Sequence, residues 1–325
     1  MQRRVPTGDN WHFRDADPRD TGGHTGLRNL TRCRVHRVTT NAEHRRALGL
    51  LLLCGLFWST AGVLIKFVDW HPGAIWSARC AIAAVLLYAI RRPSFANISR
   101  AEWGAAVALA ATTGLFILAN KLTTAANAIL IQYSAPVWVA LLGRWFLGER
   151  ASRLDWISIG LVLCGVTVFF FDQLSFDHAT GNLVALAAGV AFAFGAMTMR
   201  MVGRDASSDP IRPLLLGNIL GALLGAPFWA FGDLPDASGW AALLALGLVQ
   251  QAAAYFCYAA AVRHATAIEV MLIPVIEPIL SPLWVAIAFD EWPSGWALIG
   301  GTIVVAAVTL RGVLGRRPKV SLAYE

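Results

Sequence analysis

Two stretches of this chain follow one pattern: APVWVALLGRWFLGE at residues 135–149 and EPILSPLWVAIAFDE at residues 277–291. In each stretch a proline near the start, Pro136 or Pro278, is followed thirteen residues later by a glutamate that ends an apolar run. The two prolines are 142 residues apart. An apolar helix that recurs with the same ends indicates the internal duplication of a larger unit.

The correspondence extends beyond these two stretches. At the same offset TTAANAILIQYSAP (123–136) aligns with ATAIEVMLIPVIEP (265–278). The starts of the two halves align at an offset of 134, which places Gly55 opposite Gly189 and Lys66 opposite Arg200. The sequence therefore predicts two related units, at residues 47–171 and 181–314.

Composition indicates a membrane protein. Of the 325 residues, 57% are hydrophobic and only 14% are charged, and the mean hydropathy is +0.56. A soluble domain of this length needs far more polar surface, so the predicted fold class is an all-α polytopic membrane protein. Ten apolar segments have roughly the length of a membrane span: 47–68, 72–90, 103–120, 125–147, 154–171, 181–201, 212–231, 239–262, 268–289 and 294–314.

Each predicted unit contains five helices, which is an odd number. The second unit must therefore enter the membrane in the opposite sense, so that Glu149 and Glu291 end their helices on opposite sides. Inverted repeats of this kind are typical of transporters that work by alternating access.

Basic residues favour one side of the predicted bundle. With the N-terminus inside, the outer loops hold only Lys121. The inner loops and the C-terminal tail hold Arg91, Arg92, Arg100, Arg144, Arg150, Arg153, Arg200, Arg204, Arg212, Arg263, Arg311, Arg316, Arg317 and Lys319. The positive-inside bias then places both termini in the cytoplasm, and the membrane is expected to be the bacterial cytoplasmic (inner) membrane.

The two ends of the chain are predicted to be cytoplasmic tails. Residues 1–46 hold ten arginines and few large apolar residues, which is typical of a disordered arm. A basic arm can touch nucleic acid or anionic lipid, but the charge bias of cytoplasmic segments accounts for it, so no nucleic-acid partner is expected. A start upstream of the native first residue is the other interpretation. Residues 315–325 form the second tail.

The paired AP…GE and EP…DE signatures, with the run WSTAG (58–62) and Lys66, resemble the EamA-type drug/metabolite transporter superfamily. The resemblance covers about residues 47–314. It implies ten helices, a central cavity lined mainly by helices 1, 3, 4, 6, 8 and 9, and secondary transport of small metabolites, frequently efflux. The second copy departs from the family pattern, since FDE (289–291) stands where Gly-Glu is usual and Glu277 precedes Pro278.

Glu277 is the most informative charge within a predicted span. Pro274, Pro278 and Pro282 recur every four residues around it and remove three backbone donors. At mid-membrane depth such a broken helix must be covered by protein or line a cavity. There Glu277 can take up a proton or neutralise a substrate amine, and the alternative is a protonated carboxyl bonded to a neighbouring helix.

Two basic residues in the spans have less certain roles. Lys66 lies on a helix face of small residues that either borders a cavity or packs on a neighbour while the lysine reaches the interface. For Arg79 a structural ion pair or a helix-end contact is favoured, and substrate binding is the alternative. Glu149 meets the negative end of its helix dipole, which Arg150, Arg153 or the N-terminus of the next helix would have to compensate.

Amides, phenols and indoles in matching helices of both halves predict a polar, largely uncharged pocket with aromatic walls. The candidate substrate-binding residues are Trp58, Lys66, Asn120, Gln132, Tyr133, Trp138, Gln251, Tyr255, Tyr258, Glu277 and Ser281. The structural or gating candidates are Arg79, Pro136, Glu149, Pro274, Pro278, Pro282 and Glu291.

The leading hypothesis is a secondary transporter of amino-acid-like or amphipathic metabolites. The chain lacks a GxxxxGK[ST] nucleotide-binding loop and the HExxH and GxSxG motifs, and neither a metal nor a cofactor is expected. A membrane-embedded enzyme acting on lipid or isoprenoid substrates and a non-transporting scaffold are the alternatives. The expected partners are a small-molecule substrate, the lipid bilayer and a proton. The spacing of Gly217, Gly221 and Gly225 suits a homodimer as well as packing within one chain.

Overall fold

Every regular element in the described part of the chain is a helix. The computed structural model describes residues 40–174, 178–205, 207–290 and 294–314, and within these ranges no strand occurs. The prediction of an all-α polytopic membrane protein is confirmed. Nine helical stretches there have the length and composition to cross a membrane: Asn41–Lys66, Pro72–Arg91, Arg100–Leu122, Ala125–Leu147, Ala179–Arg204, Ile211–Ala230, Ala237–Ala261, Ala267–Phe289 and Gly295–Leu314.

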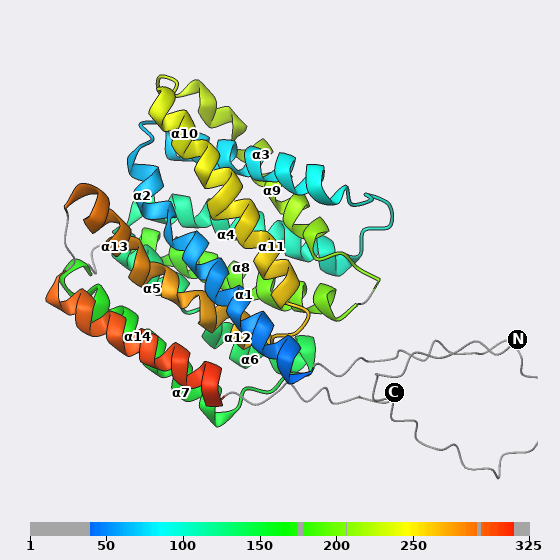
Figure 1. The fold of residues 1–325 in the computed structure, drawn as a ribbon. Coiled ribbons are helices and arrows are strands. Elements are labelled where there is room, and N and C mark those ends of the chain that lie inside the picture. The colour runs from blue at the N-terminus through cyan, green and yellow to red at the C-terminus, as the bar shows by residue number, and fades with distance from the viewer. Residues whose placement is uncertain (1–39, 175–177, 206, 291–293, 315–325) are drawn as a thin grey trace, which may run out of the picture. The chain divides into compact units, whose positions relative to one another are not determined.

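The fifth predicted span is the shortest. Helix α7 (Arg153–Phe169) has 17 residues, which at ~1.5 Å per residue is slightly less than the ~30 Å hydrocarbon core of a bilayer. It packs along α14 (Gly295–Leu314), and the two lie side by side in Figure 1. The short turn η1 (Phe171–Gln173) follows it.

Three further spans are single helices, and five are interrupted. The single helices are α3 (Pro72–Arg91), α4 (Arg100–Leu122) and α8 (Ala179–Arg204). The interrupted spans of the first half are α1 (Asn41–Ser59) with α2 (Ala61–Lys66), and α5 (Ala125–Gln132) with α6 (Ala135–Leu147). Those of the second half are α9 (Ile211–Gly225) with η2 (Ala226–Ala230); α10 (Ala237–Ala245), η3 (Leu246–Ala253) and α11 (Ala254–Ala261); and α12 (Ala267–Leu272), η4 (Ile273–Ile276) and α13 (Glu277–Phe289).

Side-chain caps fix where four of the helices begin. Thr40, Ser99, Ser152 and Thr266 each accept from the backbone of an acidic residue three positions on, whose carboxylate accepts from the cap in turn. This reciprocal arrangement satisfies amides that a helix start leaves unpaired. In α1 it brings the helix start to Asn41, so residues 41–46 are helical although the sequence predicted an arm up to residue 46. Residues 1–39 and 315–325 of the predicted tails lie outside the described residues.

Equivalent spans of the two halves are broken at equivalent places. Helix α5 ends at Tyr133 and Ser134, just before Pro136, and α12 passes into the 3₁₀ turn η4, just before Pro278. Proline causes both breaks because it lacks the amide hydrogen that the helical ladder requires. The sequence predicted the second break from its three prolines.

A glycine on a neighbouring helix packs against each break. A Cβ atom added to Gly55 in α1 would lie 3.0 Å from Cα of Pro274 and 3.1 Å from its carbonyl oxygen. A Cβ added to Gly189 in α8 would lie 3.0 Å from the carbonyl oxygen of Gln132. Gly55 and Gly189 are the residues that align at the offset of 134, so the repeated sequence gives repeated packing.

The helix pairs also follow an exchange of the two halves. Helix α4 packs on α8 and α1 packs on α11, while α3 packs on α9 and α7 on α14. In the other half, the counterpart of α4 is the span that contains α11, and the counterpart of α8 is the span that contains α1. Exchanging the halves therefore converts the α4–α8 pair into the α11–α1 pair. The other two pairs are unchanged, because each consists of a helix and its own counterpart. This is the relation expected for inverted repeats about a twofold axis in the membrane plane, and the predicted architecture is therefore confirmed.

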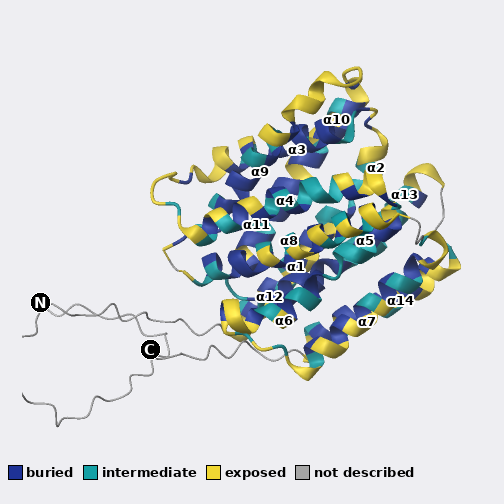
Figure 2. Ribbon diagram, turned by 180° about the vertical axis from the view of Figure 1, so that it is seen from behind, coloured by how far each residue is buried: buried dark blue, intermediate teal, exposed yellow. Residues whose placement is uncertain are grey.

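The outward faces of the helices are apolar. Large side chains such as Val85, Trp145 and Ile287 are 71%, 73% and 72% exposed. Figure 2 shows exposed residues along the outer faces of helices whose inner faces are buried. Hydrocarbon rather than water is the solvent that suits such faces, because every helical backbone group is already paired within its own helix.

Candidate functional site

A cavity of about 340 Å³ lies between the two halves. The first half lines it from α1, α2, α3, α4 and α5, and the second half from α8, α9, η3, α11 and α13. Its volume is within the ~300–1,000 Å³ typical of small-molecule sites. The resemblance implied a cavity lined by the first, third, fourth, sixth, eighth and ninth spans. The structure adds the second and seventh spans, which are helices α3 and α9.

Nine of the eleven predicted substrate-binding residues line this cavity. They are Trp58, Asn120, Gln132, Tyr133, Gln251, Tyr255, Tyr258, Glu277 and Ser281. The other two lie elsewhere. Lys66 ends α2, and its amine lies 5.1 Å from the ring centre of Phe289. Trp138 donates from Nε1 to Ser134 Oγ at 3.1 Å.

Glu277 joins the two broken spans. It is the first residue of α13, directly after the η4 turn, and its Oε2 accepts a long hydrogen bond of 3.5 Å from the Tyr133 hydroxyl. Tyr133 ends α5 at the corresponding break of the first half. Both irregular segments therefore present a polar side chain to the same cavity.

The small-residue face of α1 is mainly a packing seam. Trp284 of α13 donates from Nε1 to Ser59 Oγ at 2.8 Å, and a Cβ on Gly62 would meet Ser281 Oγ. Gly62 also borders the cavity. Of the two interpretations of this face, the described contacts favour packing against α13, with the cavity at its edge.

A buried amide cluster supports the opposite wall. Gln251 in the π-helical turn η3 donates from Nε2 to Asn218 Oδ1 and, at 3.3 Å, to Cys80 Sγ. Asn218 in turn donates to the carbonyl oxygen of Leu214 at 2.7 Å. A π-helical turn re-aims side chains within a helix and is frequent at functional sites, and here it presents Gln250 to the cavity.

Arg79 borders the cavity as well. The sequence favoured a structural ion pair or a helix-end contact for it over substrate binding, and the structure places it within α3. Its Nε atom is buried and has no hydrogen-bond partner among the described residues. The wall that holds the amide cluster therefore also carries a guanidinium group.

Ion pairs between the halves gather at one end of the bundle. We name this the arginine-rich end, where Arg91, Arg204, Arg212, Arg263 and Arg311 lie. Glu149 at the end of α6 accepts from Arg200 Nε at 3.1 Å, from Arg204 at 2.6 Å and from the Ala267 amide at the start of α12 at 3.2 Å. The compensating charges predicted for Glu149 were Arg150 and Arg153, but those observed come from α8, because that helix packs on α6.

A second buried group at this end contains four charges or potential charges. Glu269 lies 3.4 Å from His44 Nε2 and 3.2 Å from Arg311, which also contacts Asp155 at 2.7 Å. His44 Nδ1 donates to the carbonyl oxygen of His264 at 3.0 Å. All four side chains are more than nine-tenths buried, and removal of one partner from such a group leaves an uncompensated buried charge.

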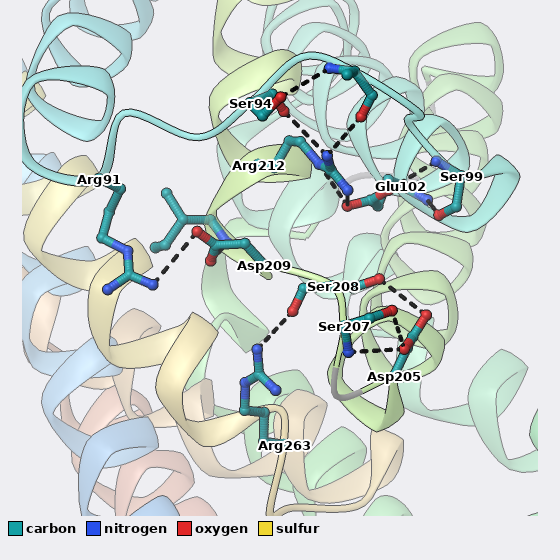
Figure 3. Close-up of polar contacts among 12 residues, drawn as sticks. Arg91, Ser94, Ser99, Glu102, Asp205, Ser207, Ser208, Asp209, Arg212 and Arg263 are labelled. Carbon is teal, nitrogen blue, oxygen red and sulfur yellow. Dashed lines mark hydrogen bonds and ion pairs between the residues drawn. The ribbon is translucent and has the colours of Figure 1, made fainter. Parts of the chain in front are cut away.

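A third group joins the loops at the same end (Figure 3). Arg212 donates from Nε to Glu102 at 2.7 Å and also to the carbonyl oxygens of the 94–96 loop, and Arg91 contacts Asp209 at 3.4 Å. Arg263 donates to the Ser208 carbonyl oxygen at 2.7 Å. Each ion pair here joins one half to the other.

Sequence reasoning missed these pairs, although a local signal was present. Glu102, Asp155 and Glu269 are the acidic residues of the SRAE, SRLD and TAIE capping patterns, and each has a basic partner from the other half. The pattern places the acid in the first helical turn, but nothing local identifies its partner. The other predicted gating glutamate, Glu291, lies outside the described residues.

The start of α5 differs from the start of α12 at the corresponding position. Thr124 caps α5 and Asn127 takes the third position, where α12 has Thr266 and Glu269. The Asn127 amide donates to Asn182 Oδ1 of α8 at 3.0 Å. A neutral contact in one half thus replaces a charged one in the other.

Together these features define a multi-pass helical membrane protein in which two related halves enclose a mainly apolar cavity that contains several polar and charged groups. The EamA-like transporter family model matches residues 45–171 and 179–312. The chain belongs to this family.

Similar proteins carry transporter names. The "Probable terminal-alkyne amino-acid exporter" of Streptantibioticus cattleyicolor is 25% identical over 296 residues, which are 85% of this chain and 97% of that protein. The "Uncharacterized transporter YwfM" of Bacillus subtilis is 25% identical over 79% of this chain and 92% of its own length. A solved structure with 22% identity superposes with a TM-score of 0.71 over 85% of this chain and all of that chain, which supports the fold alone.

Proposed function

We propose that this protein is a secondary transporter that exports small metabolites across the cytoplasmic membrane by alternating access. The observation that carries the proposal is the cavity that both inverted halves line together, with a polar residue of each broken span inside it. Two halves related by a twofold axis give two packings of similar energy, each open to one side.

The ion pairs at the arginine-rich end support a conformation closed on that side. Glu149, Glu269 and Glu102 each hold a basic residue of the other half, so these contacts must break before the halves can separate there. We assign this end to the cytoplasm because its loops carry most of the lysine and arginine residues.

Glu277 is the proposed proton carrier. The titratable groups near it are Tyr133 from α5, Arg79 from α3 and Cys54 from α1. A carboxyl among these groups can change its charge as the cavity exchanges one aqueous side for the other. Proton release to the cytoplasm and proton uptake from outside would couple export to a proton gradient.

Amino-acid-like or amphipathic compounds are the proposed substrates. The cavity combines Glu277 and Arg79 with aromatic groups such as Trp58 and Tyr258, whose ring centres are 6.1 Å apart. The similar protein from Streptantibioticus cattleyicolor is named as an exporter of an amino acid.

Counterflow into proteoliposomes tests the proposal. The purified protein would be reconstituted with a mixed metabolite panel inside the vesicles, and uptake would be measured by mass spectrometry with and without a pH gradient. Selective exchange of a few compounds supports a carrier, and an effect of the gradient supports proton coupling. A correctly inserted protein that exchanges nothing contradicts the proposal and favours the enzyme or scaffold alternatives.

A further inference from the structure

Two buried polar atoms at the cavity have no partner among the described residues. They are Nε of Arg79, a donor, and Oε1 of Gln250, an acceptor. Gln250 is only 6% exposed, and both residues border the cavity. A buried donor or acceptor that stays unpaired raises the free energy of the protein, so such atoms normally meet a ligand or an ordered water.

The neighbouring polar groups are already satisfied by one another. Gln251 donates to Asn218 and to Cys80, and Asn218 donates to the backbone of its own helix. This cluster holds the π-helical turn in place against α3 and α9. It therefore fixes η3, which carries Gln250, on α3, which carries Arg79, without using the groups of either residue that lack partners.

The acidic group of the cavity comes from a different wall. Glu277 belongs to α13, whereas Arg79 belongs to α3, and in Figure 1 these two helices lie on different sides of α1. Both residues border the cavity, and no hydrogen bond or ion pair joins them in the described residues. One cavity thus offers a guanidinium group at one wall and a carboxyl group at another.

We infer that Arg79 binds the carboxylate of a zwitterionic substrate, while Glu277 and Gln250 Oε1 accept from its ammonium group. A guanidinium group matches a carboxylate in charge and planar geometry. A simple amine would leave Arg79 unpaired, and a simple carboxylate would bring an anion towards Glu277, so both are disfavoured. This inference rests on the proposed transport function and narrows its substrates to molecules that carry both charges.

The apolar part of the substrate has a wall of its own. Trp58, Tyr258 and Phe192 also line the cavity, and their rings suit an aromatic or long aliphatic side chain. An aromatic amino acid is therefore a suitable probe, and its derivatives allow each charge to be removed separately at nearly constant size.

The first test uses the wild-type protein in nanodiscs and isothermal titration calorimetry. The probes are L-phenylalanine, L-phenylalanine methyl ester, phenethylamine and 3-phenylpropionate. We expect L-phenylalanine to bind most tightly, and loss of either charge to weaken binding by about 30-fold or more, as for a buried charge pair that loses one partner. A methyl ester that binds as tightly as the free amino acid overturns the inference without any mutation.

Variants then assign the charges to residues. Arg79→Gln should abolish the preference for L-phenylalanine over its methyl ester, whereas Arg79→Lys should retain part of it. Arg91→Gln on the same helix is the matched control, since Arg91 lies outside the cavity in a half-exposed pair with Asp209. An Arg79→Gln variant that keeps the wild-type preference overturns the assignment. If this variant does not fold, Arg79→Lys and the wild-type series decide the question.

The same series separates this inference from the proposed function. If members bind and cross the membrane but the carboxylate makes no difference, the transporter proposal stands and the role of Arg79 is wrong. If no member binds to folded wild-type protein, the inference is overturned, and the counterflow panel decides independently whether the protein is a carrier.

Discussion

Replacement of Glu149 by glutamine should open the arginine-rich end. The Glu149 side chain is 15% exposed and its partner Arg200 only 3%, so the substitution removes a charge that a buried guanidinium depends on. Loss of one partner of a buried ion pair costs about 3–5 kcal/mol. We take the lower figure because Arg200 keeps its hydrogen bonds to the carbonyl oxygens of Val262 and Arg263. About 3 kcal/mol corresponds to a shift of about 100-fold between the closed and open forms.

Thiol labelling measures this shift. Met199 borders the cavity and is 3% exposed, so a cysteine in its place, with the five native cysteines replaced by alanine, reports access from the arginine-rich end. We expect Glu149→Gln to increase the labelling rate with a membrane-impermeant reagent by at least about tenfold.

Asp209→Asn provides the matched control at the same end. It breaks the pair with Arg91, whose two side chains are 52% and 29% exposed. An exposed pair contributes about 0–1 kcal/mol, so the labelling rate should change by less than about fivefold. If both variants label alike, or if Glu149→Gln labels no faster than the parent, the ion pairs do not hold this end closed.

Three further outcomes follow from the packing and the charges. Gly300→Ala should lower the free energy of unfolding by ~1–3 kcal/mol, because its Cβ would lie 2.3 Å from the Phe169 amide nitrogen; Gly312→Ala in the same helix meets nothing within 4 Å, and equal unfolding midpoints for the two would contradict this. Glu277→Gln should leave the unfolding midpoint unchanged while transport is lost or becomes independent of pH, and a wild-type pH profile would exclude this residue from the mechanism. Glu269→Gln should destabilise the protein by about 3–5 kcal/mol in thermal unfolding, because it leaves two basic partners buried, and a loss below ~1 kcal/mol would show that the group is not coupled.

Much of the fold is predictable from this sequence, because its largest signals are local or repeated. Apolar runs of membrane length predict the spans, and the prolines around Glu277 predict where one of them breaks, whereas the break before Pro136 was not predicted. The aligned glycines, Gly55 and Gly189, indicated the duplication, and the structure places both against those breaks. The start of α1 was predicted late because its first turn is polar, and only the cap at Thr40 shows that the helix has begun.

The site was predictable in part, for a related reason. Tyr133 could be assigned to the cavity because polar and aromatic residues concentrate in matching helices of both halves, and Glu277 because it lies beside a break that its prolines predict. Lys66 and Trp138 lie elsewhere because their direction depends on the local turn of an interrupted helix. The partners of Glu149 were not predictable, since they depend on which helices pack at the arginine-rich end.

The contrast between the starts of α5 and α12 has a kinetic consequence. Asn127 makes amide contacts where its counterpart Glu269 makes ionic ones within a buried group. In an alternating-access carrier, unequal contacts on the two sides give the two closed forms different free energies. This skew means that one closed form is populated more than the other. Microscopic reversibility still requires that the ratio of solute concentrations on the two sides of the membrane at equilibrium does not depend on this difference. The skew therefore alters turnover in each direction, but uphill transport has to draw on a coupled gradient.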